Sequence, residues 1–140
     1  MSKGKVVVLV LGLAVVIGLG VWGSPADGGP VIPQPDVPVK AIPSYALDIQ
    51  PIFDRSCSQC HGSGAAPAGM DLSGYPGVMQ GSVNGPMVLP GHPGMSNLVA
   101  HLKKEVDPEL WRQCLSLGQE PTPNQVKNLE RWIEAGARDN

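Results

Sequence analysis

The sequence of 140 residues has few charged side chains, few aromatic rings and little cysteine. Only 16% of its residues are charged and only 4% are aromatic. The formal net charge is −2, and this near balance excludes a nucleic-acid binder that works through a basic surface. Three cysteines leave one over after pairing, which excludes a small disulfide-stapled scaffold. By contrast, 18 glycines and 15 prolines indicate that much of the chain forms loops.

One long apolar run lies at the N-terminus. Val6–Trp22 contains 17 residues without a charge and follows Lys3 and Lys5. Because a helix needs roughly 17–25 apolar residues to cross a bilayer, this run predicts a single transmembrane helix within residues 1–23. The lysines should stay in the cytoplasm, which places the rest of the chain on the periplasmic or extracytoplasmic side of the cell membrane. A cleaved signal peptide is the alternative, although its apolar core is normally only about 7–15 residues long.

The next segment, residues 24–44, is rich in proline. Proline fixes φ and removes a backbone donor, so neither a helix nor a central strand is expected here. We interpret the segment as a tether that joins the membrane helix to a folded domain of residues 45–140. In a polyproline conformation, which advances about 3.1 Å per residue, it would span about 60 Å. The tether is therefore long enough to let the domain move or to lie along a partner subunit.

The start of the folded domain predicts a helix. Apolar residues at Leu47, Ile49, Ile52 and Phe53 have helical spacing, which Pro51 interrupts. Further along, residues 72–93 are rich in glycine and proline and show no clean alternation of apolar and polar residues. That segment therefore predicts turns rather than strands.

Three helix starts are marked in the second half of the domain. Ser96 predicts the N-cap of a short helix, and Asp107-Pro108 combines an N-cap residue with proline at the first helical position. The best-marked helix follows Thr122-Pro-Asn-Gln125, which has the pattern of a capping box, and ends at Gly136. The domain is therefore expected to be all-α, with a thin core that a large buried cofactor would help to fill.

The informative motif is Cys57-Ser-Gln-Cys60-His61. C-x-x-C-H is the attachment signature of c-type haem. Two residues between the thiols set their separation to match two vinyl groups of one porphyrin, and the adjacent His61 is the proximal iron ligand. One motif predicts one covalently bound haem c, attached through Cys57 and Cys60. Attachment takes place outside the cytoplasm, in agreement with the export signal.

Other interpretations of the two cysteines are weaker. A zinc site usually takes a second pair of ligands, and the sequence has none. A thioredoxin-like dithiol would lie in a βαβ setting, which the pattern does not show. A structural disulfide between Cys57 and Cys60 would leave the adjacent His61 unexplained.

Further motifs resemble the small bacterial class I c-type cytochromes, in particular the branch abundant in planctomycetes. The resemblance covers Asp48 to Ala137 and rests on segments that follow one another in the family's order: Ile52-Phe53, Cys57–Gly62, Gly69–Leu72, Ser73–Tyr75, Leu89–Pro93, Ser96–Leu98 and Trp132–Ala137. It implies a class I cytochrome c fold in which the first and last helices cross over one mostly buried haem. It also implies electron transfer, so the chain is expected to be an electron carrier rather than an enzyme.

The sequence departs from that family at the sixth iron ligand. The family usually supplies it from a Met-Pro step shortly before the last helix, but no methionine follows Met95 here. The expected position falls near Cys114, which is our first candidate for the distal ligand. A thiolate would stabilise ferric iron and lower the reduction potential relative to methionine. Alternatively, Cys114 is a buried small hydrophobe or forms a disulfide with another subunit.

Other side chains are alternative distal ligands. Met87 and Met95 flank a Pro-Gly-His-Pro turn that could place a thioether over iron, and methionine is also a common filler of irregular cores. His101 lies in the helix expected after Ser96, where a solvated surface role competes with ligation. His92 is a weaker alternative in the turn itself, and a vacant sixth position is the last.

The combined interpretation is a membrane-anchored monohaem c-type cytochrome. It would transfer electrons outside the cytoplasmic membrane, to or from a respiratory or photosynthetic membrane complex or a soluble redox protein. The alternatives are a haem subunit of a periplasmic oxidoreductase, with a thiolate-ligated or open sixth position, and a haem-based sensor. Beyond Gly23 the chain has eight basic and twelve acidic residues, a mild acidity that favours a partner with a basic docking patch.

Overall fold

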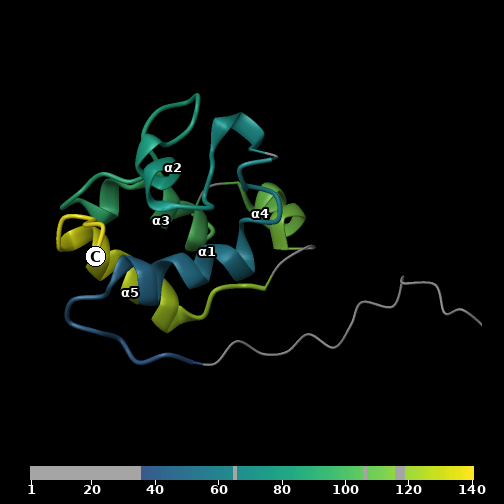
Figure 1. Cartoon of the computed structure of the whole chain (residues 1–140). Helices are drawn as coiled ribbons and strands as arrows, with labels where there is room; N and C mark the ends of the chain where they lie inside the picture. Colours follow the sequence, from purple (N-terminus) through teal and green to yellow (C-terminus); the bar gives the residue numbers. More distant parts are fainter. Residues whose placement is uncertain (1–35, 65, 106, 116–118) are drawn as a thin grey trace, which may run out of the picture. The chain divides into compact units, whose positions relative to one another are not determined.

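Figure 1 shows a computed structural model of the chain, which describes residues 36–64, 66–105, 107–115 and 119–140. These residues form no β-strand, and one isolated antiparallel β-bridge pairs Ser82 with Gly85. The all-α prediction is confirmed for this part of the chain. The elements, in order, are the π-helical turn η1 (Tyr45–Ile49), α1 (Gln50–Ser56), the 3-10 turn η2 (Pro67–Gly69), α2 (Tyr75–Gln80), the 3-10 turn η3 (Pro93–Met95), α3 (Asn97–Leu102), α4 (Pro108–Leu115) and α5 (Pro123–Glu134).

The predicted membrane helix at residues 1–23 lies outside the described residues, as does the tether from residue 24 to residue 35. Among the helices that the structure describes, none combines the length and the apolar character needed to cross a membrane.

The first helical segment has a change of pitch just before Pro51. η1 is a wide turn that closes with the Gln50 N–H donating to the Tyr45 carbonyl, and α1 follows directly with Pro51 in its first turn. Proline fits there because the first N–H groups of a helix have no intrahelical acceptor. Ile49 and Phe53 are fully buried, whereas Leu47 is 76% exposed. The helix expected here is confirmed, but Leu47 does not share its buried side with Ile49 and Phe53.

The last helix agrees with its sequence signals. The Thr122 hydroxyl oxygen accepts from the Gln125 N–H at 3.2 Å, and the Gln125 side chain accepts from the Thr122 N–H at 2.8 Å. This is the predicted capping box. At the other end Gly136 has φ +99°, which lets the Ala137 N–H turn back to the Trp132 carbonyl at 2.9 Å. Both ends of α5 are thus determined by local chemistry.

Two details of the middle segment differ from the expectations. Residues 75–80 form α2, although the segment predicted turns alone. Ser96 does occupy the N-cap position of α3, but its side chain does not cap the helix. Instead its hydroxyl donates to the His92 carbonyl at 3.0 Å and accepts from the Leu89 N–H at 2.9 Å. Ser96 therefore fixes the turn before α3, and this use of the hydroxyl replaces the expected cap.

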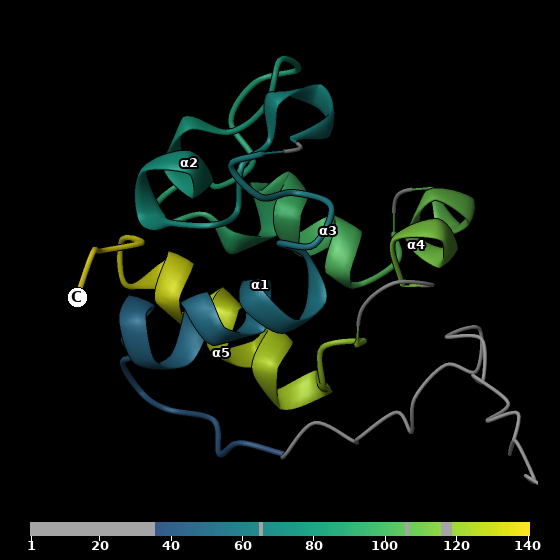
Figure 2. The same ribbon diagram turned by 45° about the vertical axis from the view of Figure 1, so that its right-hand side comes forward.

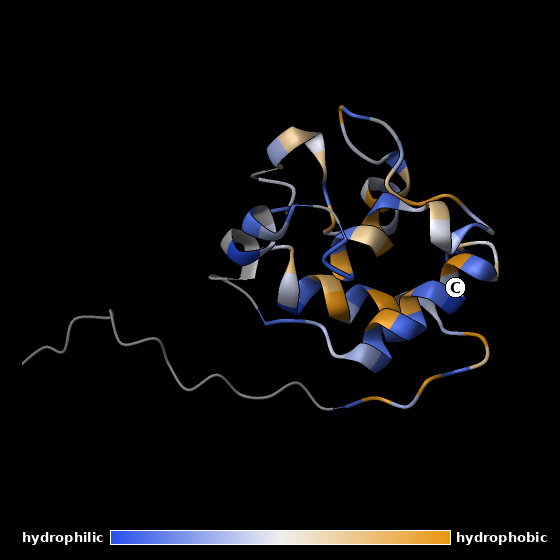
Figure 3. Cartoon of the chain, turned by 180° about the vertical axis from the view of Figure 1, so that it is seen from behind, coloured by the Kyte–Doolittle hydropathy of each residue, from blue (hydrophilic) through white to orange (hydrophobic). Residues whose placement is uncertain are grey.

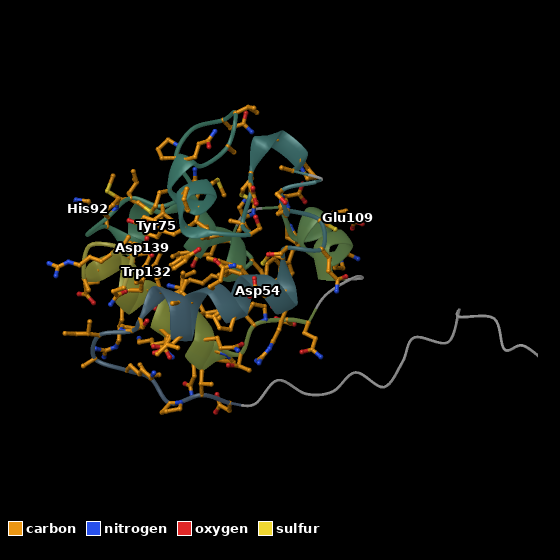
Figure 4. All side chains as sticks on the ribbon, in the orientation of Figure 1. Asp54, Tyr75, His92, Glu109, Trp132 and Asp139 are labelled. Atoms are coloured by element: carbon orange, nitrogen blue, oxygen red, sulfur yellow. The ribbon has the colours of Figure 1, made fainter. Side chains whose placement is uncertain are left out.

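The turn η1, which begins the first helical segment, packs against the last helix, α5 (Figures 1 and 2). An aromatic cluster joins η1, α2 and α5, and in it the Tyr45 ring centroid is 5.1 Å from that of Tyr75 and 5.4 Å from that of Trp132. Figure 4 shows Tyr75 next to Trp132. The Trp132 ring N–H donates to the Arg138 carbonyl at 2.8 Å, and the Tyr75 hydroxyl donates to the Ala137 carbonyl at 3.0 Å. These bonds hold the C-terminal residues against the core, whose hydrophobic helix faces meet in Figure 3.

Candidate haem-binding site

The two cysteines and the histidine lie on one tight turn at the end of α1. Cys57 is the C-cap residue of α1, and its N–H and that of Ser58 both donate to the Phe53 carbonyl at 2.8 Å. The Cys57 carbonyl then accepts from the N–H of Cys60 at 3.1 Å and from that of His61 at 2.9 Å. These bonds continue the helical path for one more turn. The two thiols and the imidazole are therefore held in a short, hydrogen-bonded stretch of backbone.

Gly62 allows this turn to close. A β-carbon at position 62 would lie 2.6 Å from the Ser58 carbonyl oxygen, which is shorter than real β-carbon contacts. Any other residue would push the backbone away from Ser58, inside the motif itself. The glycine directly after His61 is therefore a requirement of the turn.

The imidazole of His61 is held by a second segment of the chain. Its Nδ1 lies 3.2 Å from the Met70 carbonyl oxygen. Since a carbonyl only accepts, Nδ1 carries the proton and Nε2 keeps its lone pair for a metal. Iron-binding and other metal-binding histidines are commonly oriented in this way by a backbone carbonyl.

The returning segment is bonded to the motif at further points. The Leu72 N–H donates to the His61 carbonyl at 2.6 Å. The Leu72 carbonyl accepts from the Ser58 hydroxyl at 3.3 Å and from the Gln50 side chain at 3.1 Å. Residues 70–72 therefore brace the motif against α1.

The residues present fit a covalently attached haem. Cys57 and Cys60 are both partly buried and are not joined in a disulfide, and Cys57 packs against the hydrophobic core. The ring N–H of Trp111 on α4 is a buried donor without a hydrogen-bond partner among the described residues. An acceptor-bearing group in the adjoining space would satisfy it, and the haem propionates are acceptors of that kind. No three His, Cys, Asp or Glu side chains of the described residues gather as a separate metal site.

The candidate distal ligands fall in different environments. Cys114 lies within α4, but its side chain is outside the described residues. Met87 is 7% exposed in the core, and its carbonyl accepts from the Leu98 N–H at 3.0 Å. Met95 is 69% exposed at the end of η3, and His101 is partly buried on α3. The identity of the distal ligand therefore stays a prediction, with Cys114 first.

Sequence reasoning missed the partner of His61. The side chain of Met70 packs against the core. The atom that orients the imidazole is its backbone carbonyl, which every residue carries. No side-chain pattern could have found it, and only the path of the loop between residues 61 and 70 reveals it.

The comparisons with known proteins agree with the motif. The family model of planctomycete cytochrome c matches residues 57–110, a stretch that begins at the first thiol and ends within α4. No curated protein and no solved structure matches the chain significantly. Residues 57–110 are therefore similar in sequence to planctomycete cytochrome c, and this similarity supports a haem-based electron carrier.

Proposed function

We propose that this chain is a membrane-anchored monohaem cytochrome c that carries electrons outside the cytoplasmic membrane. The proposal rests on one observation. The His61 imidazole is held at Nδ1 by the Met70 carbonyl, on the same turn as Cys57 and Cys60. That arrangement leaves Nε2 available beside two thiols with the spacing of haem attachment.

Each residue has a distinct task in this proposal. Cys57 and Cys60 would hold the haem covalently through thioether bonds. His61 Nε2 would be one protein ligand to the iron, and Cys114 is the first candidate for the other. When bound, the haem supplies a one-electron ferric/ferrous couple. The protein contributes the axial ligands, the burial and the hydrogen bonds that set its potential.

The N-terminal sequence supports the location and the partner that we propose. The apolar run Val6–Trp22 behind two lysines supports a single-pass anchor with the haem domain on the periplasmic side. A domain held by a tether has a high effective concentration near complexes in the same membrane. We therefore propose a membrane-bound electron-transfer complex as one partner and a second carrier, membrane-bound or soluble, as the other.

The test is expression of the full chain in a bacterium that matures c-type cytochromes. The membrane fraction should contain a protein whose mass exceeds the sequence mass by one haem and whose denatured pyridine spectrum has the bands of haem c. A one-electron reduction should be reversible in a potentiometric titration. The double variant Cys57→Ser/Cys60→Ser should lose covalent haem while it is still exported. A wild-type chain that reaches the same compartment without haem would refute the proposal.

A further inference from the structure

A large part of the surface that begins at the haem motif is without charge. Between His61 and Leu102 the sequence has a single charged residue, Asp71. Its carboxylate accepts from the Ser73 N–H at 2.9 Å and from the Ser73 hydroxyl at 2.6 Å. We call residues 61–102 the uncharged lobe, and Figures 1 and 2 show it on the side of α5 that carries α2 and α3. Every other charged side chain of the chain lies before or after it.

The exposed positions of the uncharged lobe are small, apolar or neutral. They are Gly, Ala, Pro, Ser, Gln, Asn, His, Val and Met among the described residues. Val83 is 78% exposed and Met95 is 69% exposed, so the lobe offers two apolar side chains to a partner without a charge on either. The Val83 N–H donates to the Ala68 carbonyl at 2.8 Å, so the loop that carries Val83 is attached to the loop after the haem motif.

The uncharged lobe is also the part of the molecule connected most directly to His61. It includes His61 itself, the Met70 carbonyl that orients the imidazole, and the Leu72 N–H that bonds to the His61 carbonyl. Electron transfer slows steeply with distance, so the surface nearest to the haem ligands is where a redox partner must approach. In the uncharged lobe that surface consists of loops and short helices with Asp71 as their one charged side chain.

All charged side chains of the described residues except Asp71 lie outside the lobe, and some of them form ion pairs. Ion pairs join Lys40 to Asp48 at 2.6 Å, Lys103 to Glu130 at 2.5 Å and Lys104 to Glu120 at 2.6 Å. The overall acidity, which favours a partner with a basic patch, is therefore not the charge that a partner would meet at the uncharged lobe. A basic patch placed there would lose its hydration and gain only the Asp71 carboxylate in return.

We propose that the uncharged lobe is the docking face for the redox partner, and that the partner is a redox protein with an equally neutral, partly apolar face around its own cofactor. The proposal rests on the proposed electron-carrier function. Association through such a face gains little from electrostatic steering and depends weakly on salt. Val83 is its most exposed large apolar side chain among the described residues.

Two small oxidants of opposite charge test the local charge without the natural partner. Reduced full-length protein in a neutral detergent at pH 8 gives one electron either to hexacyanoferrate(III), an anion, or to tris(phenanthroline)cobalt(III), a cation. The rate of haem oxidation is followed by its visible absorption. Salt is varied from about 0.01 M to about 1 M, over which the Debye length falls from about 30 Å to about 3 Å.

We expect both rate constants to change by less than about twofold over this range, because the only charge on the reacting face is the Asp71 carboxylate. If the overall negative charge governed the approach, the anion would react faster with added salt and the cation slower, and that pair of trends would overturn the proposal. A chain that cannot be reduced or oxidised at all would refute the electron-carrier function itself. The two failures are therefore distinguishable.

A pair of matched variants locates the face. Val83→Lys puts one positive charge on the uncharged lobe and should raise the low-salt rate with hexacyanoferrate by about threefold or more. Leu47→Lys adds the same charge at a similarly exposed position outside the lobe and should leave that rate nearly unchanged. Equal effects of the two variants would overturn the assignment. Self-association of the wild-type protein in sedimentation experiments, if Val83→Lys abolishes it, would also overturn the assignment. The lobe would then bind a second copy of the chain.

Discussion

The side-chain amide of Asn128 bonds to the backbone of a segment 88 residues away in the chain. Its Oδ1 accepts from the Lys40 N–H at 2.8 Å, and its Nδ2 donates to the Pro38 carbonyl at 3.1 Å. Asn128 lies on α5 and is 1% exposed. The final residues of the proline-rich segment are therefore fastened along the last helix, and Pro43 is fully buried there. The tether leaves the haem domain from a fixed place.

Asn128→Ala should release this end of the tether. The variant removes two hydrogen bonds and leaves backbone groups without partners, so we expect a loss of about 1–3 kcal/mol in the free energy of unfolding. Limited proteolysis should cut near residues 38–43 faster than in the wild-type protein. Asn84→Ala, at an exposed turn position, is the control and should change neither result. Unchanged cleavage in Asn128→Ala would contradict the role of this side chain.

The two ends of α5 show what could be predicted from the sequence. Thr122, Gln125 and Gly136 act through bonds to neighbours within five residues, so their pattern was enough to place the helix. Asn128 acts across the fold, and a single asparagine in a helix carries no sign of its partner. The exposure of Leu47 was missed for a related reason, because the π turn depends on how η1 packs against α5.

Gly62→Ala should disturb the haem motif from within. The added carbon would meet the Ser58 carbonyl at 2.6 Å, so the turn between the two cysteines must open. We expect a loss of about 1–3 kcal/mol in stability, the usual cost of overpacking, together with a lower yield of covalent haem. Gly64→Ala is the matched control, since a carbon at position 64 meets no atom within 4 Å. The measurement is the ratio of haem to protein in purified material, and equal ratios in the two variants would contradict the expectation.

The stability of the domain should fall at high pH because of Tyr45. Burial raises the pKa of the Tyr45 hydroxyl well above its ordinary value of about 10. The unfolded chain therefore ionises first, so this stabilisation is complete below about pH 10 and is lost as the pH rises further.

Tyr45→Phe tests this dependence. The variant keeps the ring in the aromatic cluster but loses the hydrogen bond from the hydroxyl to the Gln50 side chain, so at pH 7 it should be less stable by about 1 kcal/mol. Above about pH 10 the difference should shrink, because only the wild-type protein has this proton to lose. Urea unfolding at a series of pH values measures both quantities. A difference that stays constant up to the alkaline limit would show that Tyr45 does not contribute to the pH dependence.

The candidate site, like the fold, has parts that the sequence identifies and parts that only the structure reveals. The two thiols and His61 form one local motif, so the sequence alone identified them as a group. The Met70 carbonyl and the position of Gly62 against Ser58 depend on backbone geometry, which leaves no pattern in the side chains. At the position expected for the distal ligand, near Cys114, the sequence departs from the family pattern, so it identified only candidates.

The distal ligand decides the redox character of the protein, and Cys114→Ala tests the first candidate. If a Cys114 thiolate binds the iron, the oxidised wild-type protein should give a low-spin thiolate signal in electron paramagnetic resonance. The variant should lose that signal, and its reduction potential should rise, because the thiolate no longer stabilises ferric iron. Met87→Leu is the control, and it should leave the signal unchanged. If Met87→Leu changes the spectrum and Cys114→Ala does not, the buried thioether of Met87 is the ligand and Cys114 serves packing alone.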